Sequence, residues 1–378
     1  DGPLDPRLRV TLFGPNGDAL TSTTTAVTPT AGTHVASRIS IDVGTIERWW
    51  PHSHGGQPLY RMRIELIDRR GTVHAERELR VGFRTIELDT AADATGSKFT
   101  FIVNGRPIFV RGANWIPDDV FVSRVGPDRY RARIADAIDA HVDLLRVWGG
   151  GIYEDDEFYA ACDELGVLVW QDFAFACAAY PEQLLAAEVE AEARDNVARL
   201  MHHPSLALWN GNNENLWGYH DWGWQETLGD RPWGAGFYLD LLPRVCATLD
   251  PLRPYWAGSP WSGSDHVHPN ADAHGCVHVW DVWNDVDLDR YRDRTPRFVA
   301  EFGWQAPPSV RTLEEYLGQD ALNRSTPAWA RHQKATDGDL KLDRGIAARF
   351  GPITDFEAFC YAAHVVQARA IRTGIEHF

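Results

Sequence analysis

The sequence lacks the features that mark membrane, secreted and disulfide-rich proteins. No run of about 20 apolar residues could span a bilayer, and residues 1–5 lack the basic and apolar parts of a signal peptide. The five cysteines are odd in number and show no Cys-x-x-Cys spacing, which argues against a disulfide framework and against a cysteine zinc site. We therefore expect free thiols, with Cys177 as a packing residue. We also expect a cytoplasmic location, with a secreted or lysosome-like compartment as the alternative.

Positive charge is scarce relative to negative charge. The chain carries 37 Lys and Arg residues against 53 Asp and Glu residues, a formal net charge of −16. A surface this acidic repels phosphate backbones and anionic lipid head groups. We therefore expect no nucleic-acid partner and no membrane partner.

Motifs for nucleotide and metal binding are also missing. No Gly-x-Gly-x-x-Gly turn follows a predicted strand, residues 149–151 (Gly-Gly-Gly) have the wrong spacing to cradle a pyrophosphate, and no Gly-Lys-Ser/Thr loop occurs. The histidines at 266, 268, 274 and 278 show no His-Glu-x-x-His or equivalent spacing. We expect neither a metal nor a cofactor.

Aromatic residues, by contrast, are abundant. The 378 residues include 16 tryptophans and 11 tyrosines. Flat amphipathic rings at this density suit a site for sugar rings, but a large aromatic core would give the same composition. Composition alone favours the aromatic core.

About the first 90 residues alternate β-rich runs with turn residues and show no helical period. This pattern is typical of an immunoglobulin-like β-sandwich. The small and polar stretch at 91–97 predicts a boundary, so we expect residues 1–97 to form this domain. The predicted strands are residues 8–13, 35–41, 59–66 and 73–81.

From residue 98 onward, apolar runs alternate with helical segments, which predicts parallel strands joined by crossover helices. The predicted helices are residues 128–141, 154–165, 181–203 and 355–377. The seven predicted strands are residues 108–112, 142–148, 167–172, 205–209, 254–258, 276–280 and 297–301. Because a (β/α)8 barrel of TIM type closes at eight strands, we expect residues 98–378 to form such a barrel without its last strand. An open doubly wound sheet is the alternative fold.

Polar and aromatic side chains gather where these strands end, which is where barrels of this type carry their active sites. The side chains concerned are Arg146, Trp148, Asp172, residues 210–215, His278, Trp280 and Glu301. Among them, Glu214 and Glu301 are candidates for an acid/base and a nucleophile. Glycoside cleavage needs two such carboxyl groups, one ionised and one protonated. Each glutamate taken alone could instead belong to a buried ion pair or to a helix N-terminus.

Seven longer motifs occur in a fixed order along the chain. They are residues 49–60, 81–84, 111–117, 145–151, 170–173, 209–214 and 300–305. Together they resemble the β-mannosidases of glycoside hydrolase family 2, from about residue 40 to residue 378. The segment Arg-Val-Trp-Gly-Gly-Gly at 146–151 is similar to the mannosidase pattern, whereas the β-galactosidases and β-glucuronidases of that family carry a different, His-containing sequence.

The resemblance implies a retaining exo-β-mannosidase, which hydrolyses terminal non-reducing β-D-mannose by double displacement without a cofactor. Glu301 would attack the anomeric carbon. Glu214 would protonate the leaving oxygen and then activate water, with the two carboxyl groups about 5–5.5 Å apart. The partner would be a β-mannoside oligosaccharide, while the oligomeric state stays open.

The resemblance also implies the residues that hold the sugar. Asn213 would hydrogen-bond the sugar 2-hydroxyl, and Arg146 would keep Glu301 ionised through a charge-assisted bond. Trp115, Trp148 and Trp280 would wall the sugar subsite. Asp172 and His278 complete the predicted site, although His278 could equally be a core histidine. Trp222 either forms part of a shelf for the leaving group or packs the long segment after Glu214.

Two alternatives to this function stay open. One is another family 2 enzyme, either an exo-β-glucosaminidase or an endo-β-mannosidase. The other is a sugar-binding, catalytically silent fragment. Family members carry a further amino-terminal sandwich and an eighth strand that this sequence lacks, so we expect the chain to be a piece of a longer polypeptide. We expect this piece to be less stable and less active than the longer polypeptide.

Overall fold

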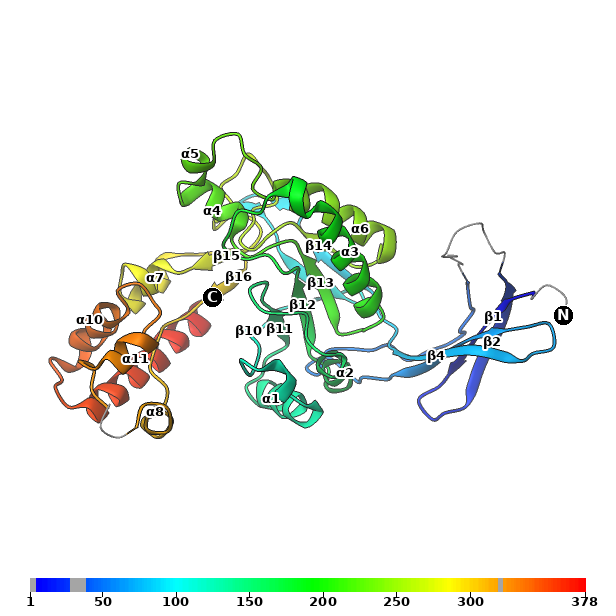
Figure 1. Cartoon of the computed structure of the whole chain (residues 1–378), viewed down its shortest axis with the longest axis horizontal. Helices are drawn as coiled ribbons and strands as arrows, with labels where there is room; N and C mark the ends of the chain where they lie inside the picture. Colours follow the sequence, from blue (N-terminus) through cyan, green and yellow to red (C-terminus); the bar gives the residue numbers. More distant parts are fainter. Residues whose placement is uncertain (1–4, 28–38, 319–321) are drawn as a thin grey trace. The chain divides into compact units, whose positions relative to one another are not determined.

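The computed structural model describes residues 5–27, 39–318 and 322–378 (Figure 1). Contacts divide the chain into two compact units, one made of Asp1–Asp89 with Thr100–Gly258 and the other of Thr90–Phe99 with Ser259–Phe378. This division differs from the predicted boundary between 1–97 and 98–378, which stays a prediction. Among the described residues, no helix is long and apolar enough to cross a membrane.

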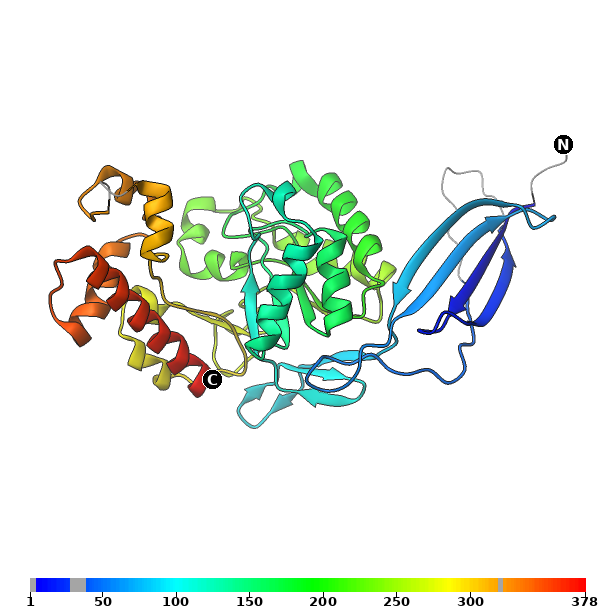
Figure 2. The same cartoon turned by 90° about the horizontal axis from the view of Figure 1, so that it is seen from below.

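The first unit starts with a four-stranded antiparallel sheet in the order β2-β1-β3-β4 (Figure 2). Its strands are β1 (Arg7–Phe13), β2 (Ala19–Ala26), β3 (Tyr60–Ile67) and β4 (Val73–Val81). Val10 and Leu12 of β1 are buried while their neighbours are less so, as the two-residue period of a strand requires. Most of the predicted strand at 35–41 lies outside the described residues, and the immunoglobulin-like sandwich stays a prediction.

A small antiparallel sheet follows, in the order β5-β8-β9. Its strands are β5 (Ile86–Asp89), β8 (Thr100–Val103) and β9 (Arg106–Ile108). The prediction of one strand at 108–112 is therefore wrong. Asn104 and Gly105 both have positive φ and turn the chain into a hairpin, so Ile108 belongs to β9 and the next strand starts only at Gly112.

The centre of this unit is a five-stranded parallel sheet in sequential order from β10 to β14. The strands are β10 (Gly112–Trp115), β11 (Leu144–Val147), β12 (Leu168–Asp172), β13 (Leu206–Asn210) and β14 (Tyr255–Trp256). Every residue of the three central strands is buried. Helices cover parallel sheets on their faces, which explains why these runs are almost continuously apolar.

Helices connect the parallel strands and lie alongside them (Figures 1 and 2). They are η1 (Val122–Arg124), α1 (Pro127–Asp139), α2 (Asp156–Leu165), α3 (Glu182–Leu200), α4 (Asn215–Asp221), α5 (Trp224–Leu228), η2 (Phe237–Leu241, a π-helix) and α6 (Leu242–Leu249). Helix α2 begins where the Asp155 side chain accepts from the Glu157 N–H, and it ends at Gly166 with a left-handed φ of 78°. The predicted helices near 128–141, 154–165 and 181–203 are therefore confirmed.

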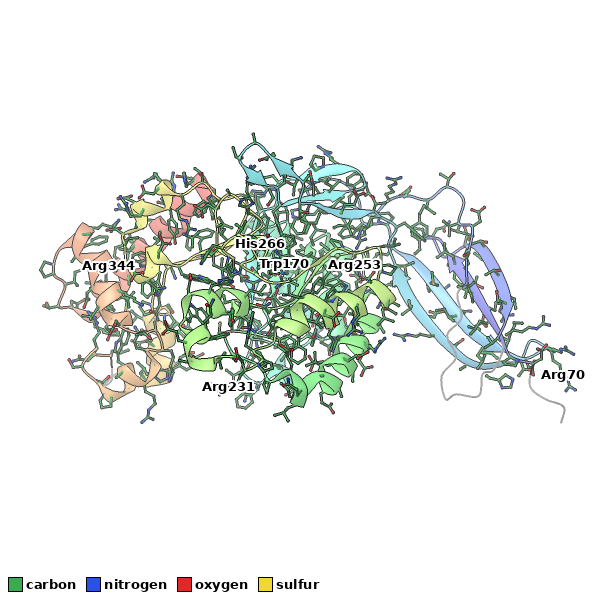
Figure 3. All side chains as sticks on the ribbon, turned by 90° about the horizontal axis from the view of Figure 1, so that it is seen from above. Arg70, Trp170, Arg231, Arg253, His266 and Arg344 are labelled. Atoms are coloured by element: carbon green, nitrogen blue, oxygen red, sulfur yellow. The ribbon has the colours of Figure 1, made fainter. Side chains whose placement is uncertain are left out.

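A buried ion pair fixes the segment between α6 and β14. Arg253, labelled in Figure 3, pairs with Asp250 and donates through Nε to the Leu206 carbonyl at 2.6 Å. Asp250 also accepts from the Trp209 indole at 2.9 Å. These bonds hold the ends of β13 and β14 in register and so position the residues that follow β13.

The second unit contains a two-stranded parallel sheet, β15 (Val277–Val279) with β16 (Val299–Phe302), and the short pair β6 (Ala92–Asp93) with β7 (Gly96–Ser97). Its helices are α7 (Asp281–Asn284), η3 (Leu288–Asp293), α8 (Val310–Leu317), α9 (Pro327–His332), α10 (Gly338–Phe350) and α11 (Phe356–His377). The indoles of Trp283 and Trp304 meet edge to face at 5.2 Å in its apolar core. The predicted helix at 355–377 is confirmed as α11.

The chain therefore consists of antiparallel sheets followed by parallel strands that alternate with helices. Six of the seven predicted parallel strands correspond to β11–β16, and the first is displaced to β10. The strands of each unit form open sheets within that unit. Closure into a barrel stays a prediction.

Candidate active site

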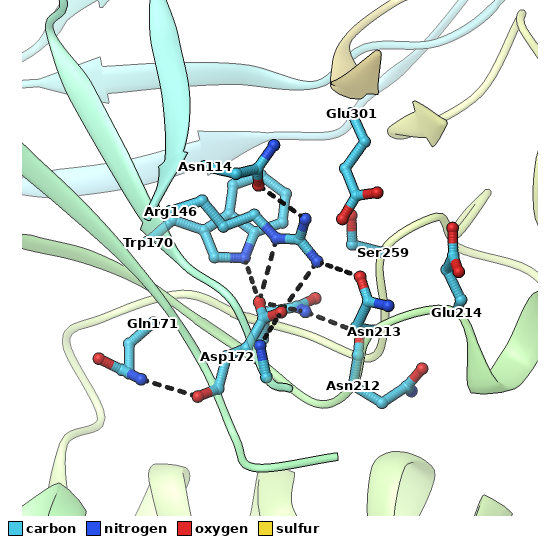
Figure 4. A network of polar contacts seen from close by, with 12 residues as sticks. Asn114, Arg146, Trp170, Gln171, Asp172, Asn212, Asn213, Glu214, Ser259 and Glu301 are labelled. Carbon is cyan, nitrogen blue, oxygen red and sulfur yellow. Dashed lines mark hydrogen bonds and ion pairs between the residues drawn. The ribbon is translucent and has the colours of Figure 1, made fainter. Parts of the chain in front are cut away.

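In the first unit, the carboxyl ends of neighbouring parallel strands bring Arg146 and Asp172 together. Arg146 is the next-to-last residue of β11 and Asp172 ends β12. Their side chains form a two-pronged ion pair with Nη2–Oδ2 at 2.8 Å and Nε–Oδ1 at 3.3 Å (Figure 4). Both residues are almost completely buried, at 2% and 1% exposure. A buried charged pair of this kind is stable only when both partners are present.

Asp172 accepts hydrogen bonds from several further groups. The Trp170 indole donates at 2.9 Å, the Asn210 amide at 2.7 Å and the Gly149 N–H at 3.0 Å. Desolvation raises the pKa of Asp172 above its usual value, while Arg146, the Asn210 amide and the Gly149 N–H act in the opposite direction. Asp172 therefore anchors Arg146 within a polar network enclosed by the sheet.

Arg146 extends this network to the loop after β13. Its Nη2 donates to Asn213 Oδ1 at 2.8 Å, and its Nη1 donates to Asn114 Oδ1 at 2.9 Å (Figure 4). Asn114 was missed at the sequence level, although it lies inside the motif at 111–117 and near the end of β10. The predicted bond from Arg146 to Glu301 would join the two units, and it stays a prediction.

Glu214 lies between β13 and α4, where the chain turns sharply. Its backbone is left-handed, with φ of 63°, and the residue is 9% exposed. The Cys177 thiol donates to its Oε2 at 3.3 Å. A positive φ is uncommon for a residue other than glycine and persists where its surroundings fix it, often in functional sites.

Cys177 has a different environment from the one predicted for it. It is an exposed free thiol, so its interpretation as a packing residue is wrong. Its sulfur also accepts from the Asn213 amide at 3.3 Å. No short motif surrounds a cysteine of this kind, so only the fold reveals its proximity to Glu214.

Three tryptophans predicted in the site belong to the first unit, and their surroundings differ. The Trp115 ring is 8% exposed, donates to Glu154 at 2.8 Å and packs against Phe158 at 4.8 Å. Trp148 is half-buried and lies over Gly150, where a Cβ atom would come within 2.0 Å of the ring. This close approach gives Gly150 a packing role. Trp222 is 40% exposed.

The second unit brings together the other predicted site residues. The register of β15 and β16 pairs His278 with Glu301. Glu301 Oε2 lies 3.3 Å from His278 Nδ1 and accepts from the Trp280 indole at 2.9 Å. Glu301 is 9% exposed and His278 is fully buried. This carboxyl group is therefore held by two ring nitrogens in a nearly dry environment.

Ser259 adds a contact that the sequence did not indicate. Its hydroxyl lies 2.8 Å from His278 Nε2, so both ring nitrogens of this histidine have a partner. The partner on one ring nitrogen sets where the proton sits on the other. A serine donating to Nε2 would place the proton on Nδ1, facing Glu301.

The predicted site residues thus form two groups, one in each unit. The first unit holds Arg146, Asp172, Asn213 and Glu214, and the second holds His278, Trp280 and Glu301. The separation between the carboxyl groups of Glu214 and Glu301 stays a prediction, as do the expected absences of a metal and a cofactor. Chemically, each group contains one glutamate whose carboxyl oxygen accepts a hydrogen bond.

Comparison with known proteins identifies relatives over most of the chain. Residues 2–84 match the model of glycosyl hydrolases family 2. A β-mannosidase of Capra hircus is 35% identical, over 90% of this chain and 41% of its own length. β-Mannosidase B of Emericella nidulans is 34% identical, over 89% of this chain and 41% of its own length. The chain thus spans about two fifths of the length of these curated relatives.

A solved structure agrees with these sequence relationships. The crystal structure of a β-D-mannosidase from Dictyoglomus thermophilum matches with a TM-score of 0.91 and 39% identity. The match covers 99% of this chain and 46% of that one. The chain is therefore homologous to β-mannosidases over most of its length, and its residues 2–84 match glycosyl hydrolases family 2.

Proposed function

We propose that the chain carries the catalytic residues of a retaining exo-β-mannosidase, which removes terminal non-reducing β-D-mannose by double displacement without a cofactor. The observation that carries this function is the pair of supported glutamates at the ends of parallel strands, in a chain 39% identical to a β-D-mannosidase over 99% of its length. The (β/α)8 barrel predicted from the sequence is part of this proposal, and so is the cytoplasmic location.

Glu301 is the nucleophile in this mechanism. Its carboxylate forms a bond to the anomeric carbon as the bond from that carbon to the leaving oxygen breaks, which gives a covalent mannosyl-enzyme. The Trp280 N–H, 2.9 Å from Oε2, supports this role because a donor to a carboxylate stabilises its ionised form. The nearby His278 ring restricts the carboxyl group to one orientation.

Glu214 is the general acid and then the general base. It gives its proton to the departing oxygen, and in the second step it takes a proton from the water that attacks the mannosyl-enzyme. Two inversions at the anomeric carbon give overall retention. This chemistry requires the two carboxyl groups to lie about 5–5.5 Å apart.

Other residues bind the sugar in this mechanism. Asn213 donates to the 2-hydroxyl, and its amide is oriented by Arg146, which Asp172 holds in turn. Trp115, Trp148 and Trp280 wall the mannose subsite, and His278 contacts Glu301. Trp222 lies on the leaving-group side. The substrate class is a β-mannoside oligosaccharide.

The direct test of this function is release of nitrophenol from p-nitrophenyl β-mannoside by the purified chain and by E301Q. Glutamine keeps the shape of the nucleophile and removes its charge, so we expect the rate to fall by roughly 10³-fold or more. Circular dichroism establishes that both proteins are folded. Activity of E301Q above a few per cent would refute the assignment of Glu301.

Calorimetric titration with mannose separates this function from the alternative of a silent sugar-binding protein. The proposed enzyme binds mannose and turns over the aryl mannoside. A folded chain that binds mannose without turnover would select the binding function. A panel of aryl glucosaminides and endo-acting substrates, run beside the mannoside, separates the other family 2 activities.

A further inference from the structure

Cys177, Asn213 and Glu214, the proposed acid/base, form a cluster in which Cys177 has no role in the function described so far. Cys177 follows β12 in the chain, and its thiol contacts both residues of the Asn213–Glu214 pair. The sulfur donates to Glu214 Oε2 at 3.3 Å and accepts from Asn213 Nδ2 at 3.3 Å. A thiol offers one donor and weak acceptor capacity, and both are used here.

The backbone fixes where this sulfur lies. The Cys177 N–H donates to the Asn213 carbonyl at 3.0 Å, and the Asn213 N–H donates to the Phe175 carbonyl at 2.8 Å. These two bonds form a parallel bridge between Ala176 and Asn213. The position of the thiol beside Glu214 is therefore set by the main chain as well as by its own rotamer.

Both partners of the thiol–carboxyl bond have an unusual backbone. Cys177 has φ of 50° and Glu214 has φ of 63°, in the left-handed region that disfavours side chains with a Cβ atom. Such conformations persist only where surrounding contacts over-determine them, and they are concentrated in functional sites. The fold thus keeps two residues with disfavoured backbone conformations in contact with each other.

We infer that Cys177 is a positioning residue for Glu214. Its S–H···Oε2 bond restricts the Glu214 carboxyl group to one orientation. Its contact with the Asn213 amide fixes the position of the Asn213 side chain relative to that of Glu214. Cys177 acts through Glu214, and the inference rests on the proposed role of Glu214 as the general acid. The proton of the thiol stays on the sulfur throughout.

A series of leaving groups tests this inference. Misplacing the general acid harms substrates whose leaving oxygen needs protonation and spares those whose leaving group is already a stable anion. For C177A we expect kcat/KM on methyl β-mannoside to fall by about 10-fold, a fraction of the 10²–10⁴-fold that general acids contribute. On 2,4-dinitrophenyl β-mannoside we expect a change of less than about twofold, because this leaving group needs no proton.

C177S is the matched control, because its hydroxyl keeps a donor and an acceptor at the same place. We expect it to restore most of the activity on methyl β-mannoside. Equal losses on both substrates, or no recovery in C177S, would overturn the inference and leave Cys177 with a structural role only. If the wild-type chain hydrolyses neither substrate, the proposed function fails, and the inference falls with it.

Thiol modification gives a second readout that does not depend on the folding of C177A. Cys162, Cys246, Cys276 and Cys360 are at most 1% exposed, whereas Cys177 is exposed. Methyl methanethiosulfonate forms a sulfur–sulfur bond to the thiolate and releases methanesulfinate, which removes the S–H donor. We expect activity on methyl β-mannoside to fall, to return with dithiothreitol, and to be unaffected in C177S. Full activity of the modified wild-type protein would contradict the inference.

Discussion

The side chain of Asp172 shows most clearly what a single residue contributes to this molecule. It ends β12, is fully enclosed, and neutralises Arg146, which in turn orients Asn213. Removing one partner of a buried pair leaves the other charge unpaired in a medium of low dielectric constant. Such a change therefore lowers the stability of the chain and also disturbs the orientation of the Asn213 amide.

We expect D172N to lower the free energy of unfolding by about 3 kcal/mol or more, because Arg146 keeps its charge and loses its counter-charge. Urea unfolding followed by circular dichroism measures this change. D240N is the matched control, because Asp240 and Arg244 form an exposed pair, at 70% and 60% side-chain exposure, and such pairs contribute little. Equal unfolding midpoints for D172N and the wild type would contradict the structural account of this pair.

The sequence predicted the location of three polar residues at strand ends, while their roles in a site stay predictions. Arg146, Asp172 and Glu301 each end an apolar run, and each lies at or near the end of a parallel strand. Asn114, Cys177 and Ser259 were not predicted as site residues. Their contacts come from residues 32 to 37 positions away, or 19 in the case of Ser259, and no short motif encodes such pairings.

At the scale of elements, helix α4 links Glu214 to an exposed aromatic group. The Glu214 carbonyl accepts from the Gly218 N–H at 2.6 Å, and the Gly218 carbonyl accepts from the Trp222 N–H at 3.0 Å, so the three positions follow one line of the helix. The Trp222 ring lies over Gly218, where a Cβ atom would come within 2.7 Å of it. Trp217 and Trp224 flank this ring at 6.0 and 5.6 Å.

We expect W222A to raise KM for β-1,4-mannobiose by about fivefold to tenfold, because an exposed indole at the end of the helix that follows the proposed general acid can stack against the leaving sugar. Methyl β-mannoside has no second sugar ring, so its KM should stay within about twofold of the wild-type value. W222F keeps a flat ring and serves as the control. Equal changes in KM for both substrates would indicate that Trp222 only packs the segment.

The helices and strands also show which features the periodicity of apolar residues does not predict. The apolar run at 108–112 reads as one strand, yet the chain divides it between β9 and β10 because the Asn104–Gly105 turn forms a hairpin first. The sequence of the glycines at 149–151 argued against a pyrophosphate loop, but the packing of Gly150 against the Trp148 ring could be recognised only from the structure. Turn-forming residues and contacts between residues far apart in the sequence decide where such segments begin and what they pack against.

At the scale of the whole molecule, the order of elements follows from the sequence, and the division into units does not. The change from strand pairs to alternating strands and helices is visible in the apolar pattern, and the relatives cover 89–90% of the chain. The grouping of residues 90–99 with residues 259–378 depends on contacts such as the Ser97 N–H to the Ala273 carbonyl, at 3.0 Å. Nothing in the composition of residues 91–97 predicts that partner.

The proposed function depends most directly on turnover through a covalent mannosyl-enzyme on Glu301. A 2-deoxy-2-fluoro-β-mannosyl fluoride forms this intermediate and slows its hydrolysis, because the fluorine at C2 disfavours the positively charged transition state. Mass spectrometry of the digested protein then locates the sugar. We predict one fluoromannosyl group per chain, on the peptide that contains Glu301. A label on another carboxylate, or steady hydrolysis of the fluoride without any label, would contradict the role of Glu301 as the nucleophile.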